Sequence, residues 1–120
     1  MYSFESVDLG TYRGDDYFLN GFVEPELPEG EDYDPNKDAV NYGVTLARKG
    51  SHPHEKNIQI VRMDTAHGQP HLDLVYLPPD TERERKVWLD DGYTYKRMKQ
   101  YLLANWQGFA DRYIRHNELG

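Results

Sequence analysis

The sequence predicts an α+β domain in which an antiparallel sheet of four to five strands packs against one long C-terminal helix. Two observations predict this fold. Short apolar and aromatic runs separated by Gly, Pro and Asp recur within residues 1–77, with a clear period of two at 40–47, and a helical apolar period fills residues 95–116. A chain of 120 residues is long enough for one core, so we expect residues 1–120 to form a single domain.

Three strands are predicted in the first half of the chain. Residues 1–14 are typical of a short edge strand, and residues 17–23 form an aromatic-rich run that Pro25 ends. Gly21, inside that run, indicates a bulge or a close approach of another group. Residues 40–47 alternate apolar and smaller or polar side chains, the pattern of a half-buried strand.

An acidic, proline-rich segment separates the second and third of these strands. Residues 24–38 contain three prolines and seven acidic residues, with Lys37 as the basic residue among them. This composition predicts an exposed loop of unusual length, which is mobile or functional.

A β-hairpin is predicted next. Residues 58–63 and 72–77 are rich in β-branched and apolar side chains, and residues 64–70 join them. Pro78 and Pro79 end the second strand, and residues 81–86 read as a charged, solvated connector.

The last element is a helix over about residues 95–116. Thr94 is the candidate N-cap, and the apolar residues that follow have spacings of three and four: Met98, Leu102, Trp106, Phe109 and Tyr113. Gly108 in the interior should cost about 1 kcal/mol unless close packing requires it. The opposite face carries the basic residues Lys96, Lys99, Arg112 and Arg115.

Composition narrows the chemistry. The chain has no cysteine, which excludes disulfides, thiolate metal sites and a cysteine nucleophile. It has no run of about 20 apolar residues, so we expect a cytoplasmic protein without a membrane partner. The net charge of −7 comes entirely from residues 1–60, with 12 acidic and 5 basic residues, since residues 61–120 have 9 of each. This excess either keeps the protein soluble or forms a surface that repels nucleic acid or binds a basic partner.

The densest group of polar side chains surrounds the predicted hairpin turn: Arg62, Asp64, His67, His71 and Asp73. Strand alternation places Arg62 and Asp64 on one side of the first strand, and His71 and Asp73 on one side of the second. Imidazoles can act as acid and base, and a cation can hold a phosphate, which suits RNA cleavage without a metal cofactor. The same histidines and carboxylates could instead bind a divalent metal, or serve only the turn.

Other polar residues have simpler interpretations. His52 and His54 flank Pro53 in a predicted solvated turn, and Trp106 is predicted to be core. Asn105 could support the hairpin histidines through hydrogen bonds. No phosphate-binding loop, dinucleotide fingerprint, nucleophile elbow or zincin helix is present in the sequence.

The hairpin motif resembles a known pattern. Arg62-x-Asp64-x-x-His67-Gly68-x-Pro70-His71-x-Asp73, followed by Tyr95, Asn105-Trp106 and aromatic residues at 109 and 113, is similar to short prokaryotic proteins that resemble TumE-like toxins of toxin-antitoxin modules. The resemblance covers about residues 58–114. It implies a small cytoplasmic toxin with an antitoxin partner, whose site is formed by the hairpin histidines and acids.

Two hypotheses about function follow. In the first, the protein is a toxin-like ribonuclease in which His67 and His71 are acid and base, Arg62 clamps a phosphate, and Asp64 and Asp73 orient the imidazoles. In the second, it is a non-catalytic interaction protein, an inhibitor or accessory factor, whose acidic segment binds a larger partner or mimics nucleic acid. Exposed strand edges also allow a homodimer.

Overall fold

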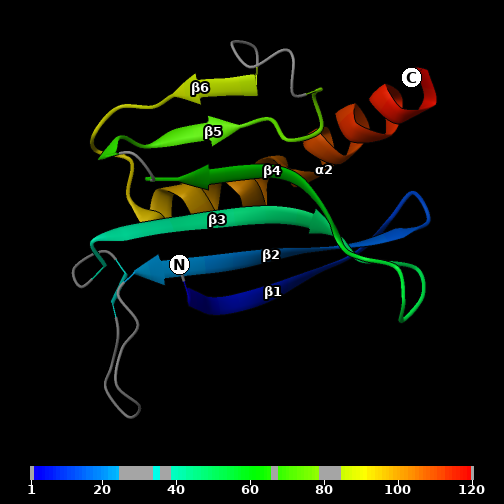
Figure 1. The fold of residues 1–120 in the computed structure, drawn as a ribbon, viewed down its shortest axis with the longest axis horizontal. Coiled ribbons are helices and arrows are strands. Elements are labelled where there is room, and N and C mark those ends of the chain that lie inside the picture. The colour runs from blue at the N-terminus through cyan, green and yellow to red at the C-terminus, as the bar shows by residue number, and fades with distance from the viewer. Residues whose placement is uncertain (1, 25–33, 36–38, 66–67, 79–84, 120) are drawn as a thin grey trace.

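The computed structural model describes residues 2–24, 34–35, 39–65, 68–78 and 85–119. Its elements are six strands, β1 (Tyr2–Tyr12), β2 (Asp15–Glu24), β3 (Asn41–Arg48), β4 (Ile58–Asp64), β5 (His71–Asp73) and β6 (Lys86–Trp88), followed by the helix α2 (Tyr95–Leu119). The strands form one antiparallel sheet in the order β1-β2-β3-β4-β5-β6, and α2 lies across one face of it (Figure 1). The predicted fold class is confirmed, with one strand more than expected.

The first hairpin turns within two residues. Tyr12 pairs with Asp15, so Arg13 and Gly14 form the loop, and both have positive φ values of 50° and 89°. Positive φ at both central residues defines the turn type that matches the twist of antiparallel strands. The register of β1 against β2 shifts at two places, between Ser3 and Glu5 and between Asp8 and Gly10. Bulges of this kind make an edge strand a poorer template for pairing with another chain.

Gly21 is a point of close approach, as predicted, and it also stands beside a bulge of β1, where the register shifts between Ser3 and Glu5. The pairing of β2 with β3 runs without a register shift through Gly21. A Cβ atom added at Gly21 would meet the hydroxyl of Tyr95, at the start of α2. The glycine therefore lets the helix begin close to the sheet.

The second half of the predicted hairpin differs from the prediction. β4 occupies the expected residues, but β5 ends at Asp73 and residues 74–77 turn back, where the N–H of Leu77 donates to the carbonyl of Leu74 (3.1 Å). A strand that was not predicted, β6, pairs with the outer edge of β5. It begins at Lys86, the last residue of the predicted connector. The N–H of Leu74 donates to the carbonyl of Arg85 (2.6 Å), which extends the pairing of β5 with β6 by a residue.

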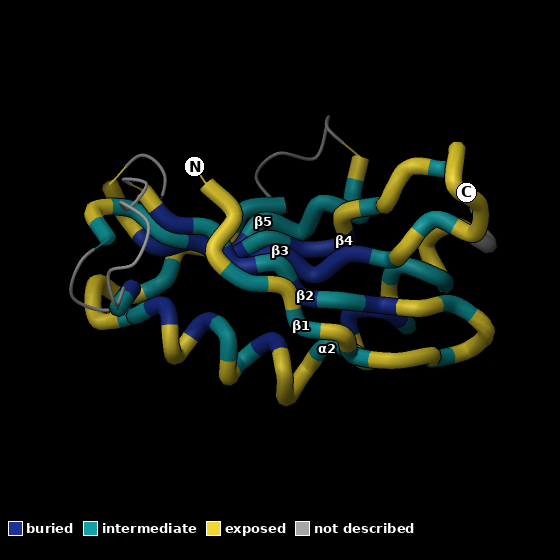
Figure 2. Tube along the Cα trace, turned by 90° about the horizontal axis from the view of Figure 1, so that it is seen from below, coloured by how far each residue is buried: buried dark blue, intermediate teal, exposed yellow. Residues whose placement is uncertain are grey.

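The core lies between the sheet and the predicted apolar face of α2 (Figure 2). Met98, Leu102 and Phe109 are buried, and Trp106 and Tyr113 pack against them. Their partners on the sheet are buried residues of β2, β3 and β4: Tyr17, Leu19, Val44, Leu46, Val61 and Met63. The N-cap is also confirmed, because the hydroxyl of Thr94 accepts from the N–H of Arg97 (3.2 Å).

The opposite face of α2 is largely exposed. Lys96, Arg112 and Arg115 are exposed, whereas Lys99 forms an ion pair of 2.6 Å with Glu5 of β1.

No described helix is long and apolar enough to cross a membrane. The predicted loop 24–38 lies mostly outside the described residues, and at its base the N–H of Val40 donates to the carbonyl of Glu24 (2.7 Å).

Gly108 has no packing role. It is exposed, and a Cβ atom added there meets nothing within 4 Å. We therefore expect Gly108→Ala to raise the free energy of unfolding by about 0.5–1 kcal/mol, because alanine loses less backbone entropy in a helix. Denaturant titration measures the change. Gly21→Ala is the matched comparison and should lower stability by about 1–3 kcal/mol through its clash with Tyr95.

Buried tyrosines should make the stability of the fold decrease at high pH. Burial raises the pKa of Tyr17, Tyr42 and Tyr95 above the usual value, and the carboxylate of Glu5 adds to the effect at Tyr95. The unfolded chain ionises its tyrosines near pH 10, so the folded state then binds more protons than the unfolded state. Stability should be fully present below about pH 10 and fall as the pH rises further. Unfolding titrations from pH 8 to 11 test this, and Tyr95→Phe should reduce the slope.

Candidate charged site on the open face of the sheet

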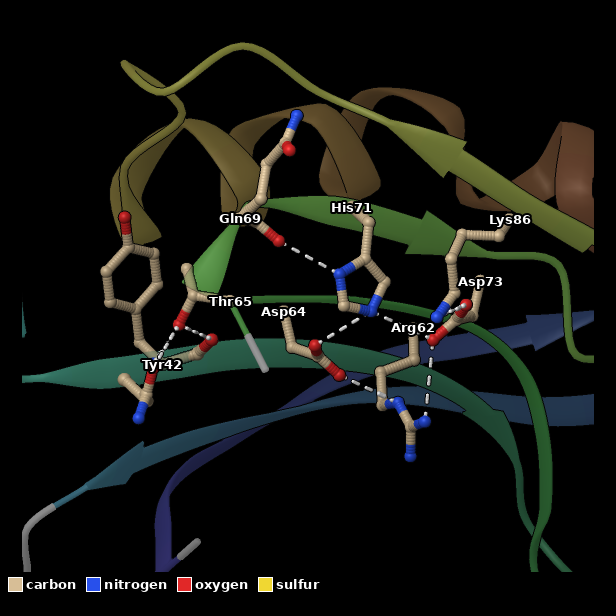
Figure 3. A network of polar contacts seen from close by, with 9 residues as sticks. Tyr42, Arg62, Asp64, Thr65, Gln69, His71, Asp73 and Lys86 are labelled. Atoms are coloured by element: carbon tan, nitrogen blue, oxygen red, sulfur yellow. Dashed lines mark hydrogen bonds and ion pairs between the residues drawn. The ribbon is translucent and has the colours of Figure 1, made fainter. Parts of the chain in front are cut away.

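Four of the predicted site residues form two neighbouring cross-strand pairs in the sheet, and each pair is part of a row of side chains that runs across the strands. Arg62 of β4 pairs with Asp73 of β5, and Asp64 pairs with His71. Paired residues of antiparallel strands point to the same face, and residues two apart on one strand do so as well. All four side chains therefore share one face, and Figure 3 shows them pointing toward one another with the helix behind the sheet.

This face is the one that α2 does not cover, and we call it the open face. The rows continue onto β6, where Lys86 pairs with Asp73 and Trp88 pairs with His71. The rows also extend to β3, where Gly43 stands opposite Asp64. A Cβ atom at Gly43 would approach the Cβ of Asp64 to 2.6 Å, so the glycine provides the room that the buried aspartate occupies.

His71 is the centre of the site. Its side chain is 2% exposed, and its Nε2 lies 3.0 Å from Asp64 Oδ1 and 3.2 Å from Asp73 Oδ2. Its Nδ1 lies 3.0 Å from the carbonyl oxygen of Gln69. A carbonyl can only accept, so Nδ1 carries a proton, and Nε2 faces two carboxylates. Either a second proton or a metal cation between Nε2 and the carboxylates makes this arrangement favourable.

Arg62 joins the two carboxylates from the solvent side. Its Nε lies 2.9 Å from Asp64 Oδ2, and its terminal nitrogen lies 3.5 Å from Asp73 Oδ2. The arginine side chain is 43% exposed, whereas Asp64 and Asp73 are 6% and 14% exposed. The guanidinium is therefore oriented by buried carboxylates while part of it still faces solvent.

A pocket of about 250 Å³ opens beside this network. It is lined by Gln59, Arg62, Asp73, Val75, Arg85 and Lys86. Three of these side chains are cationic, and Lys86 Nζ lies 3.9 Å from Asp73 Oδ1. A pocket of this composition suits an anion with several oxygen atoms, such as a phosphate.

The other predicted site features are a metal site, the histidines outside the network and Asn105. Among the described residues, Asp64, His71 and Asp73 form the group whose ligand atoms lie within 4.8 Å of one another, as a metal site requires. His67 lies outside the described residues. His52 and His54 are exposed in a turn, as predicted. Asn105 does not support the histidines, because its amide donates to the carbonyl of Tyr101 on its own helix (2.8 Å).

Sequence reasoning missed the contribution of β6. Arg85 and Lys86 were assigned to a solvated connector, and Trp88 was given no role. Trp88 is 54% exposed, and its ring lies edge to face with His71 at a centroid distance of 5.5 Å. The signal that could have revealed it is an apolar pair, Val87 and Trp88, directly after a charged run.

The fold and site define a class of small α+β protein that has a helix on one sheet face and a charged site on the other. The family described as "Domain of unknown function (DUF7718)" matches residues 33–119, and the chain belongs to this family. The matched part contains β3 to α2 and every residue of the charged site. No curated protein and no solved structure matches the chain.

Proposed function

We propose that the protein is a toxin-like ribonuclease of the cytoplasm that cleaves RNA at the open-face site. One observation carries the proposal: Arg62, Arg85 and Lys86 line one pocket together with Asp73, whose carboxylate lies 3.5 Å from Arg62 and 3.9 Å from Lys86. Cations so arranged can balance the charge of a phosphodiester, and a carboxylate among them can accept a proton. The resemblance of the hairpin motif to TumE-like toxins supports the same function.

The burial of His71 suggests how the roles divide. An imidazole that is 2% exposed does not reach a substrate, so His71 and Asp64 act as positioning residues that hold Asp73 and Arg62. In the proposed step, Asp73 accepts the proton of a ribose 2′-hydroxyl, the 2′-oxygen bonds to phosphorus, and the bond from phosphorus to the 5′-oxygen breaks. Arg62 stabilises the charge on the phosphate. His67 is the proposed donor of a proton to the departing 5′-oxygen.

A metal-assisted version rests on a separate observation. Nε2 of His71 faces the two carboxylates while Nδ1 is held by the carbonyl of Gln69, and metal-binding histidines are commonly held in this way. One imidazole and two carboxylates suit zinc or manganese, and such an ion would supply Lewis-acid activation of water or phosphate. Elemental analysis, with thermal melts in chelator and in added zinc or manganese, separates the two versions. About one ion per chain and a chelator-sensitive melt would establish the metal site.

The cleavage assay uses labelled single-stranded RNA. We expect the natural protein to cleave it, Asp73→Asn to lose about 10²–10⁴-fold in rate, and Arg62→Lys to lose about 10²-fold because lysine cannot hold two oxygens at once. Lys56→Gln is the control, because Lys56 is an exposed cation outside the site. A protein that leaves RNA intact with and without divalent metal, or an Asp73→Asn variant as fast as the natural protein, would contradict the proposal.

The proposal includes a protein partner, an antitoxin, and the acidic segment is its candidate contact. Neutralising six of the seven acidic residues of that segment should weaken partner binding and leave RNA cleavage unchanged: Glu24, Glu26, Glu29, Glu31, Asp32 and Asp34. If the protein is instead a non-catalytic interaction protein, these changes remove its effect on cells, and Asp73→Asn leaves that effect intact. Growth on expression of each variant distinguishes the two functions.

A further inference from the structure

Trp88 is an exposed aromatic residue that the proposed chemistry does not use. It lies on β6, the last strand of the sheet, and pairs with His71. At 54% exposure it presents a large apolar ring to solvent directly beside a charged site. Its ring contacts His71 of the site edge to face and lies near Lys86 of the pocket, so Trp88 is placed to contact a ligand held there.

The surroundings of Trp88 limit what it could bind. Lys86 Nζ lies 5.4 Å from the centre of the indole ring, and Lys86 also lines the cationic pocket. The pocket side of the ring therefore favours a phosphate. Asp90 and Asp91 follow Trp88 closely in the chain and are exposed, which disfavours a phosphate beyond the end of β6.

Charge near the pocket differs from that of the whole chain. Arg62, Arg85 and Lys86 line the pocket with Asp73, and Asp64 lies beside Arg62, so three cations stand against two carboxylates, while the chain as a whole carries −7. This part of the surface therefore attracts a polyanion, although the net charge of the whole chain repels one. The local excess of cations therefore favours binding of an anion at this pocket.

We infer that Trp88 stacks on a base of single-stranded nucleic acid whose phosphate lies in the pocket of Arg62, Arg85 and Lys86. The inference rests on the proposed function for its ligand class. Alternating aromatic and cationic groups are the means by which proteins hold single strands, because every base has a face that can stack. A base within a duplex has both faces covered by its neighbours, so Trp88 favours single strands.

A binding experiment tests this without cleavage. The probe is a short single-stranded oligonucleotide with 2′-methoxy groups, which lacks the attacking hydroxyl. We expect Trp88→Ala to weaken binding about 5- to 150-fold, the range that loss of one stacked base produces, and Trp88→Phe to keep most of the affinity. Lys86→Gln should lower the dependence of binding on salt, whereas Trp88→Ala should leave that dependence unchanged. Leu103→Ala removes another exposed apolar side chain, 42% exposed, from α2 and is the control.

The outcomes separate this inference from RNA cleavage. If the natural protein cleaves no RNA and Trp88→Ala still binds the oligonucleotide more weakly, the stacking site is supported and the proposed ribonuclease activity is contradicted. Equal binding by Trp88→Ala and the natural protein, or binding to duplex as tight as to single strand, overturns the stacking site. Quenching of Trp88 fluorescence on binding is also expected, with Trp88→Phe reporting the background from Trp106, which is partly buried against Tyr12 and Tyr17.

Discussion

Replacing His71 with alanine is expected to lower the free energy of unfolding by about 3–5 kcal/mol, the range for leaving a buried charge without its partner. The imidazole is the group that separates Asp64 from Asp73, at 3.0 and 3.2 Å. Its removal leaves two buried carboxylates facing each other, with the half-exposed Arg62 as their nearest cation. Denaturant titration of the purified variant measures the loss.

A double variant distinguishes charge from packing in that result. Adding Asp64→Asn to His71→Ala removes one of the two facing charges and should recover part of the stability, whereas a packing defect alone would remain. His52→Ala is the matched control, because His52 is exposed in a turn and should change stability by less than about 0.5 kcal/mol. A His71→Ala variant as stable as the natural protein would contradict the structure of the site.

Truncating Leu102 to alanine is expected to cost about 2–5 kcal/mol, because its side chain is fully buried between α2 and the sheet. Leu103, the next residue, provides a matched control, since it is 42% exposed and faces away from the core. Leu103→Ala should remain within about 0.5 kcal/mol of the natural protein. Similar losses for both variants would mean that α2 does not pack on the sheet through the face described here.

The sequence predicted α2 and β3 well because each has a clear period, whereas β1 has 11 residues and is longer than the short edge strand expected there. The spacing from Met98 to Tyr113 identified the buried face of α2, and the alternation in residues 40–47 identified β3 within one residue. β6 was missed because three residues contain little pattern, and the apolar pair Val87 and Trp88 is the only part of it that stands out in the sequence. β5 was predicted too long, since the apolar residues after Asp73 resemble a strand although the chain turns there.

The candidate site was predicted in part for the same reason. Alternation placed Arg62 with Asp64, and His71 with Asp73, and the observed register brings the two pairs together. Lys86 and Trp88 were missed because they reach the site only through the pairing of β5 with β6. The sequence also did not predict the burial of His71, because that burial depends on Asp64 of β4 and Trp88 of β6, which contact its ring.

The measurement that tests the central claim most directly is a nuclear magnetic resonance titration of the labelled protein with the 2′-methoxy oligonucleotide. We predict that the shifted signals cluster on the open face, at the indole N–H of Trp88, the guanidinium of Arg62 and the backbone of β5 and β6. Shifts confined to the exposed cations of α2, Lys96, Arg112 and Arg115, or no shifts at all, would contradict a nucleic-acid site on the open face.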